Sequence, residues 1–282
     1  MTTSVVDSHV HLWDPRRFRM AWLDGNELLD KPYGPAEYAE HTRNVAVEAF
    51  VYLEVDVAPN YGLLEARWAV ERAKQDARLR GIVAHAPVDY GEQVRAYLDE
   101  LVTCGPLIKG VRRLIQSEPD PRFAAQPRFV KGVQILADYG LSFDACLRHT
   151  QLPAVIELAR QCPRTSIIVD HLAKPAIGDK VLDPWRSHMR ELAGFPNVVC
   201  KVSGAITEAR PDWTVDDLRP YIEHVIEVFG PERVLFGGDW PVVLMNGSYQ
   251  RWADALEEIT SHASEDARRK LWGENARRVY RL

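Results

Sequence analysis

Eight short runs rich in Val, Ile, Leu and Phe recur along the whole chain, and most are separated by segments with apolar residues at helical spacing. The runs cover residues 5–11, 47–55, 79–86, 108–115, 141–147, 166–171, 198–203 and 234–239. The intervening pattern predicts helices over residues 63–77, 93–103, 129–139, 152–161 and 218–229. Such alternation produces parallel strands joined by crossover helices, and eight such units can close into a barrel. We therefore predict the α/β class, with a single (β/α)8 TIM barrel.

The length of the chain fits this architecture. The 282 residues are close to the roughly 250 of one TIM barrel, and no repeat or low-complexity linker interrupts them, so we expect one domain over residues 1–282. The alternative is an open doubly wound sheet. No Gly-x-Gly-x-x-Gly follows the first run, so neither a nucleotide nor another organic cofactor is expected. Residues 12–35 form a long predicted loop, the kind that acts as a lid or specificity element.

The composition disfavours several other classes of protein. The net charge is −5 and no basic run is present, which argues against a nucleic-acid partner. No apolar stretch approaches the ~20 residues of a membrane-spanning helix, and no signal-peptide pattern is seen. The four cysteines are widely spaced without Cys-x-x-Cys pairing, as in proteins with free thiols. We expect a cytoplasmic protein without a membrane partner, and the sequence does not indicate its oligomeric state.

Four chemically active side chains fall at the ends of predicted strands. The two-residue period places His9 and His11 on one face, at the carboxyl end of the first strand, where barrel active sites are built. His171 ends the sixth run and Asp239 ends the eighth. A lone histidine in an apolar strand is more often a core residue than a ligand. Four such groups at matching strand ends favour a catalytic site.

Three motifs carry a resemblance to a known family. The sequences VVDSHVHLW at 5–13, VDHLAKP at 169–175 and FGGDWP at 236–241 resemble the amidohydrolase superfamily (amidohydrolase family 2). The similarity covers essentially the whole chain and is greatest to the branch of L-fucono-1,5-lactonases, L-rhamnonolactonases and 2-pyrone-4,6-dicarboxylate lactonases. The segments 110–112 and 151–153 also fit that branch. The resemblance implies a hydrolase in which strand-end histidines and the aspartate bind metal or handle the attacking water.

The chain departs from the superfamily pattern at two strands. The fifth run, LSFDACL, has no histidine at its end, and the fourth has Arg112 and Arg113 where a carboxylated lysine is expected. A binuclear metal centre is therefore not predicted. If a single Zn²⁺ is bound, the ligands expected are His9, His11 and Asp239. The resemblance leaves the metal requirement open, because the branch includes members that work without one.

Hydrolysis of a lactone needs an oriented water, a base and a donor for the developing oxyanion. Asp239 is the predicted base, with His171, His9 and His11 orienting the carbonyl. The further predicted substrate-binding residues lie at strand ends or in the loops that follow them: Arg112, Arg113, Glu54, Trp13, Trp22, Trp240 and His149. Strand alternation allows only one of the two arginines to face the site. Ion pairing, rim packing and simple exposure are the alternatives for these residues.

The substrate is predicted from the scarcity of clustered arginines. A dicarboxylate lactone would need several, so we expect a neutral aldono-1,5- or 1,4-lactone, such as L-fuconolactone, from sugar catabolism. A metal-dependent decarboxylase of a small unsaturated or aromatic acid is the first alternative, although it would need tightly bound zinc and the missing fifth-strand histidine. A non-catalytic sugar-binding barrel is the second, because a fold alone does not establish activity.

Overall fold

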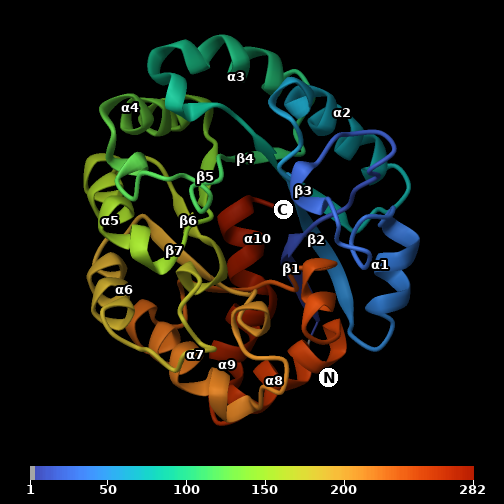
Figure 1. Cartoon of the computed structure of the whole chain (residues 1–282), viewed down its shortest axis with the longest axis vertical. Coiled ribbons are helices and arrows are strands. Elements are labelled where there is room, and N and C mark those ends of the chain that lie inside the picture. The colour runs from blue at the N-terminus through green and yellow to red at the C-terminus, as the bar shows by residue number, and fades with distance from the viewer. Residues whose placement is uncertain (1–3) are drawn as a thin grey trace.

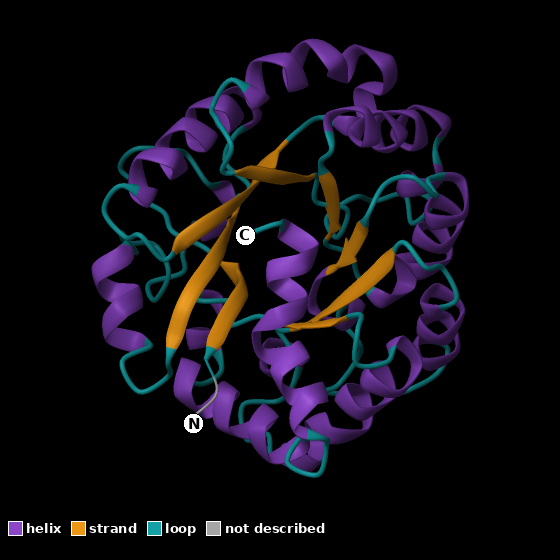
Figure 2. Ribbon diagram, turned by 180° about the vertical axis from the view of Figure 1, so that it is seen from behind, coloured by secondary structure: helices purple, strands orange, loops and turns teal. Residues whose placement is uncertain are grey.

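A single sheet of eight parallel strands in sequential order forms the centre of the molecule. The computed structural model describes residues 4–282, and its strands form a ring with most of the helices outside it (Figures 1 and 2). The strands are β1 (Val5–Val10), β2 (Val47–Leu53), β3 (Leu79–His85), β4 (Ile108–Arg112), β5 (Ser142–Ala145), β6 (Ile167–Val169), β7 (Val198–Val202) and β8 (Val234–Phe236). A parallel bridge between Val10 and Trp240 joins the first strand to the chain after β8. The predicted (β/α)8 barrel is confirmed, and each predicted run contains one strand.

The helices follow the strands in the order expected for crossover connections. They are α1 (Pro35–His41), α2 (Gly62–Ala73), α3 (Val94–Val102), α4 (Pro127–Leu136), α5 (Leu152–Gln161), α6 (Trp185–Ala193), α7 (Val215–Phe229), α8 (Tyr249–Ile259), α9 (Glu265–Arg269) and α10 (Asn275–Tyr280). All five predicted helices are present as α2, α3, α4, α5 and α7, and α5 has the predicted bounds. Within residues 4–282, none of the helices combines the length and apolar character needed to cross a bilayer.

The last helix, α10, lies inside the ring of strands (Figures 1 and 2). Ala276 and Tyr280 pack against the inward-facing apolar side chains Val6, Ala49, Val51, Leu53, Val83, Ile168, Val199 and Leu235. The Nζ of Lys109, near the start of β4, lies 3.1 Å from the carbonyl oxygen of Arg281. The helix therefore fills the end of the barrel at which the strands begin, and the functional groups occupy the opposite end.

A β-bulge in β1 decides which of its side chains face the barrel interior. Asp7 pairs with Phe50 and Val10 with Tyr52, so three steps along β1 match two along β2. Strict alternation would place Asp7 and His9 on one face. The extra residue separates them, because the Asp7 carboxylate contacts the outer helices whereas His9 joins the polar groups at the barrel mouth.

The predicted loop over residues 12–35 is ordered by aromatic packing. Trp13 and Tyr33 form an antiparallel bridge, and their rings pack edge to face with centroids 5.5 Å apart. The indole of Trp13 is buried and donates to the carbonyl oxygens of Leu29 and Lys31. Trp22 packs edge to face on Trp13, with ring centroids 5.3 Å apart, and is held near the barrel mouth.

Glu65 of α2 is a buried carboxyl group that the fold keeps protonated at neutral pH. Its Oε1 accepts hydrogen bonds from Tyr52 Oη at 2.7 Å and from Val55 N at 2.8 Å. Burial, reinforced by the nearby carboxylate of Glu54, raises the pKa of Glu65 to about 8. Folding therefore favours the protonated form of this side chain.

This raised pKa predicts a pH-dependent stability. The contribution of Glu65 to the free energy of unfolding is fully present below about pH 4.5. It is lost as the pH rises to about 8, at up to roughly 1.4 kcal/mol per pH unit. Glu65→Gln keeps an acceptor for Tyr52 and Val55 without the charge. We expect its melting temperature, relative to wild type, to be higher at pH 8.5 than at pH 5, while the exposed Glu71→Gln on the same helix shows no such trend. An equal difference at both pH values would contradict the assignment.

Candidate active site

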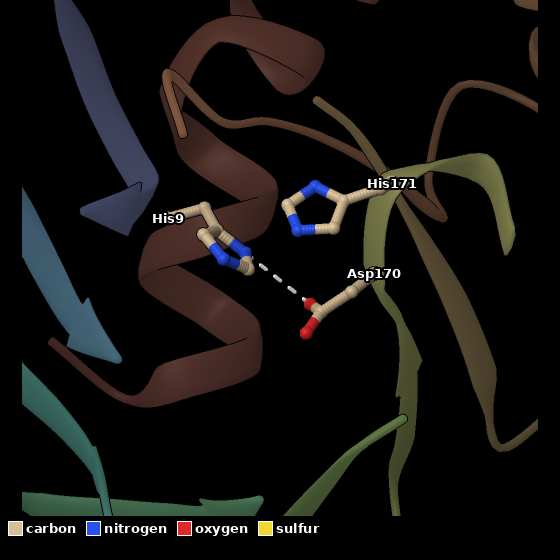
Figure 3. Close-up of side chains that lie close together, drawn as sticks. All are labelled: His9, Asp170 and His171. Atoms are coloured by element: carbon tan, nitrogen blue, oxygen red, sulfur yellow. Dashed lines mark ion pairs between the residues drawn. The ribbon is translucent and has the colours of Figure 1, made fainter. Parts of the chain in front are cut away.

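The four residues predicted to meet at the barrel mouth do lie together. The Nε2 atoms of His9 and His11 are 3.1 Å apart. Asp239 Oδ1 lies 3.7 Å from His9 Nε2, 3.6 Å from His11 Nε2 and 3.8 Å from His171 Nε2. All four side chains are buried. Figure 3 shows His9 and His171 facing one another, with Asp170 beside His9. One carboxylate oxygen thus faces three imidazole nitrogens.

Burial sets the protonation states of this cluster. It lowers the pKa of His171 to about 4, and it lowers that of His9 well below the ordinary value. Burial opposes ionisation of Asp239, but the imidazoles of His171, His11 and His9 outweigh it and hold the Asp239 pKa below its usual range. At neutral pH, His9 and His171 are therefore neutral and Asp239 is ionised.

The donor atoms fit one zinc ion. His9 Nε2, His11 Nε2 and Asp239 Oδ1 belong to a group of potential ligand atoms that all lie within 4.8 Å of one another. Tetrahedral zinc with bonds of about 2.0–2.2 Å separates its ligand atoms by roughly 3.3 Å. The Nδ1 of His11 lies 2.9 Å from the carbonyl oxygen of Leu53, so Nδ1 carries the proton and Nε2 presents a lone pair.

Lys201 of β7 lies completely buried beneath the histidines. Its Nζ is 2.6 Å from Asp144 Oδ2, 3.0 Å from Asp170 Oδ1 and 3.3 Å from His9 Nδ1. Asp144 Oδ2 also accepts a hydrogen bond from the hydroxyl of Tyr280 at 2.5 Å. A continuous polar chain thus runs from the inner helix α10 to the imidazole of His9.

Of the two candidate arginines, Arg112 faces the site. Its Nε donates to Glu54 Oε1 at 2.6 Å, its Nη2 donates to the Glu54 carbonyl oxygen, and its Nη1 lies 3.3 Å from Asp170 Oδ2. Arg113 points away from the mouth and pairs with two other acidic side chains, Asp89 and Glu118. The guanidinium of Arg112 is therefore largely occupied by protein groups, and Glu54 serves as its buried partner.

The barrel mouth carries an excess of buried negative charge. Among residues 4–282, two cations there, Arg112 and Lys201, face a larger set of buried carboxylates: Glu54, Asp144, Asp170 and Asp239. Because isolated charge is costly to bury, an excess of buried carboxyl groups over cations suits a site that takes up a cation.

Residues 171–174 form a left-handed turn directly after β6. Their φ angles are 54°, 53°, 58° and 48°, and left-handed backbone costs L-residues roughly 1–2 kcal/mol each. The Trp185 indole donates to the Leu172 carbonyl oxygen at 2.7 Å and Lys174 N donates to the His171 carbonyl oxygen at 2.8 Å. The turn brings the side chains of His171 and Lys174 to the same cavity.

Close packing after β7 fixes the ring of His171. The Oγ of Ser203 lies 2.9 Å from His171 Nδ1. The next residue, Gly204, has φ of 61°, and a Cβ atom there would lie 2.6 Å from His171 Nδ1. Glycine is therefore required at this position for the approach of the imidazole, and it adopts the positive φ without the cost that an L-residue bears.

A cavity of about 290 Å³ opens above the cluster. This is near the lower end of small-ligand sites, which run from about 300 to 1,000 Å³. His11, His171 and Asp239 line its inner part. Its other walls combine apolar and polar side chains: Trp22, Val55, Leu114, Val242 and Met245 among the former, and Arg112, Gln116, Ser117, Lys174, Thr207 and Glu208 among the latter. Its size and lining suit a small molecule with both apolar and polar surface.

The remaining predicted residues differ in their access to this cavity. Trp22 is 38% exposed and lines it, with its indole donating to the carbonyl oxygen of Val55. Trp13 and Trp240 are buried and pack the rim. His149 is half-buried, outside the lining residues, and its Nδ1 lies 2.9 Å from the carbonyl oxygen of Lys174.

Sequence reasoning missed several residues of the site. It assigned no role to Asp170, Lys174, Lys201 or Glu208, although each contacts the cluster or lines the cavity. Lys201 does carry a signal, because a lysine inside an otherwise apolar strand needs a buried partner. Nothing in the local sequence indicates the left-handed turn that places Lys174.

A (β/α)8 barrel with histidines and an aspartate at its strand ends defines the class of this protein as a barrel hydrolase. Residues 6–282 match the model of the amidohydrolase family, and the chain belongs to that family. It is 33% identical to an L-fucono-1,5-lactonase of Burkholderia multivorans, over 98% of this chain and 96% of the relative. It is 25% identical to an L-rhamnono-gamma-lactonase of Scheffersomyces stipitis, over 99% of this chain and 98% of the relative. A crystal structure of a Burkholderia multivorans amidohydrolase with bound zinc superimposes with a TM-score of 0.88 at 30% identity, covering 99% of both chains.

Asp7 connects β1 to the chain that follows β8. Its Oδ1 accepts hydrogen bonds from Gly238 N at 2.7 Å and from His9 N at 3.0 Å. Its Oδ2 accepts from Tyr249 Oη at 2.8 Å and from Tyr38 Oη at 3.0 Å. One carboxylate therefore satisfies four buried donors beside the histidines and Asp239.

Asp7→Asn tests this connection. The amide offers one acceptor oxygen, so some of the four donors lose their partner, at about 1–3 kcal/mol for each buried group. We expect a melting temperature several degrees below wild type and reduced activity, with no change for the exposed Asp212→Asn. Thermal unfolding of the two variants measures the effect, and a melting temperature of Asp7→Asn equal to wild type would contradict it.

Proposed function

We propose that this amidohydrolase opens the ring of a small neutral sugar lactone, an aldono-1,5- or 1,4-lactone such as L-fuconolactone, to give the aldonic acid. The observation that carries the proposal is the ionised carboxylate of Asp239, which faces three imidazoles at the base of a small cavity. The family and the lactonase relatives make the chain a hydrolase of lactone esters.

Asp239 is the proposed general base. The imidazole contacts are made to Oδ1, which leaves Oδ2 to take a proton from a water. That water attacks the lactone carbonyl carbon, and the carbonyl oxygen becomes an oxyanion. The acyl carbon then breaks its bond to the ring oxygen, which receives the proton from Asp239 and becomes a hydroxyl. The product is the open aldonic acid, which ionises at neutral pH.

The histidines are proposed to stabilise the charge that develops on the carbonyl oxygen. His171 is neutral and held by Ser203, so its ring can direct one nitrogen toward the substrate without loss of its position. His9, His11 and Asp239 are the residues proposed to hold one zinc ion. When bound, such an ion supplies Lewis-acid polarisation of the carbonyl group.

The charges in the cavity favour a neutral substrate. Arg112 and Lys174 are the cations among the described residues that line it, and both have acidic partners in Glu54 and Glu208. Arg113 pairs with acidic groups elsewhere. A lactone with additional carboxylates would therefore enter a cavity without a free arginine to compensate its charge.

A metal-dependent decarboxylase is the less favoured alternative. Its expected histidine at the end of the fifth strand is replaced by Cys146, which lines the cavity. Cys146 belongs to neither of the residue groups, among residues 4–282, whose donor atoms lie close enough together to hold one ion, so it does not replace the missing histidine.

Proton release on a panel of lactones tests the proposed reaction. We expect rapid hydrolysis of a neutral 6-deoxyaldonolactone, and a kcat/KM at least about 100-fold lower for 2-pyrone-4,6-dicarboxylate, since its carboxylates lack partners. The assay is repeated after chelation and after addition of zinc, with metal content measured in each sample. Absence of hydrolysis for every lactone under all three conditions would overturn the proposal.

The pH dependence gives a second test. Asp239 acts when ionised, and its pKa is held below the ordinary value, while His171 becomes neutral above about pH 4. The rate is therefore expected to rise with pH in the acid range and to be level from about pH 5.5 to 8. The measurement is kcat/KM on one lactone over pH 4–8. A steady fall from pH 5 to 8 would contradict Asp239 as the base.

A further inference from the structure

Two oppositely charged side chains face each other on the cavity wall. Lys174 Nζ lies 3.5 Å from Glu208 Oε1, and the side chains are 19% and 22% exposed. Lys174 ends the left-handed turn after β6, and Glu208 ends a short 3-10 turn (Ile206–Glu208) after β7. A hydrogen bond from Gly178 N to the Glu208 carbonyl oxygen, at 2.9 Å, ties the two segments together.

The contact between these groups leaves much of their hydrogen-bonding capacity unused. Charge-assisted hydrogen bonds are about 2.7–2.9 Å long, so 3.5 Å is an ion pair with a weak hydrogen bond at most. An ammonium group has three donors and a carboxylate has about four acceptor positions. Arg112, the other cation of the cavity, is by contrast occupied by Glu54 and Asp170.

We propose that Lys174 and Glu208 recognise two neighbouring hydroxyl groups of the substrate. The ammonium donates to the oxygen of one hydroxyl, and the carboxylate accepts the proton of the next. Trp22, Val55 and Met245 supply apolar surface of the same cavity for the carbon face of the ring. The pair determines specificity and has no part in attack on the carbonyl. This inference rests on the proposed function, and it narrows the substrate to lactones with a free vicinal diol.

The strained backbone beneath Lys174 supports this assignment. Four consecutive non-glycine residues, 171–174, have positive φ, and such conformations persist where a functional site requires them. A conventional right-handed turn after β6 would direct Lys174 elsewhere. The same turn carries His171, so the diol-binding cation and an imidazole of the reaction centre are fixed by one element.

The test compares the specificity of Lys174→Met with that of wild type. The measured quantity is the ratio of kcat/KM for L-fucono-1,5-lactone to that for δ-valerolactone, which has no hydroxyl groups. Loss of a charged hydrogen bond predicts a fall in this ratio of roughly 10- to 100-fold. The matched control is Lys131→Met, which removes the lysine of an exposed Lys131–Glu92 pair. A ratio within twofold of wild type, whether both rates fall together or neither falls, would overturn the proposal.

Glu208→Gln and the double variant test whether the two residues act as a unit. If they bind one diol, the fold-loss of the kcat/KM ratio in the double variant is much smaller than the product of the fold-losses in the two single variants. A fold-loss in the double variant equal to that product would contradict the pair.

Calorimetric binding of the 1,5-lactam of the same sugar separates this inference from the proposed function. We expect at least about 10-fold weaker binding to Lys174→Met than to wild type. If wild type hydrolysed no lactone but showed this difference, the proposed function would fail and the diol site would stand. Equal lactam binding by the two proteins would overturn the diol site.

Discussion

The site depends most on the hydrogen bonds that the carboxylate of Asp7 accepts. It accepts hydrogen bonds from the backbone of His9 and of Gly238, and it therefore joins the first strand to the segment that carries Asp239. Two further backbone hydrogen bonds run across this junction, from Asp239 N to the His9 carbonyl oxygen and from His11 N to the Trp240 carbonyl oxygen. The hydrogen bonds that close the barrel between β1 and the segment after β8 therefore also set the distance between the histidines and Asp239.

The second constraint is the buried charge beneath the cavity. Lys201, Asp144 and Asp170 have no access to solvent, so each must be paired, and removal of one partner would leave a costly isolated charge. These pairs set the position of His9, and through Asp144 they extend to Tyr280 of the inner helix α10. The inner helix therefore completes the core of the barrel and also supports the polar groups that hold the active-site imidazole.

Much of the fold and part of the site could be predicted from the sequence, because both depend on periodicity. The eight strands follow from apolar runs, and the proximity of His9, His11, His171 and Asp239 follows from their positions at strand ends. The outward direction of Asp7 could not be predicted, since it depends on a single extra residue in β1. The cavity positions of Lys174 and Glu208, and the pairing of Arg112 with Glu54 and Asp170, depend on tertiary packing that local patterns do not encode.

In the proposed reaction, the ionised Asp239 drives attack of water on a lactone. The most direct measurement is the rate of hydrolysis of L-fucono-1,5-lactone by Asp239→Asn at saturating substrate, with the exposed Asp254→Asn as control. We expect a fall in kcat of about 1,000-fold for Asp239→Asn with an unchanged circular dichroism spectrum, and a rate near wild type for the control. A rate for Asp239→Asn within a few-fold of wild type would contradict it.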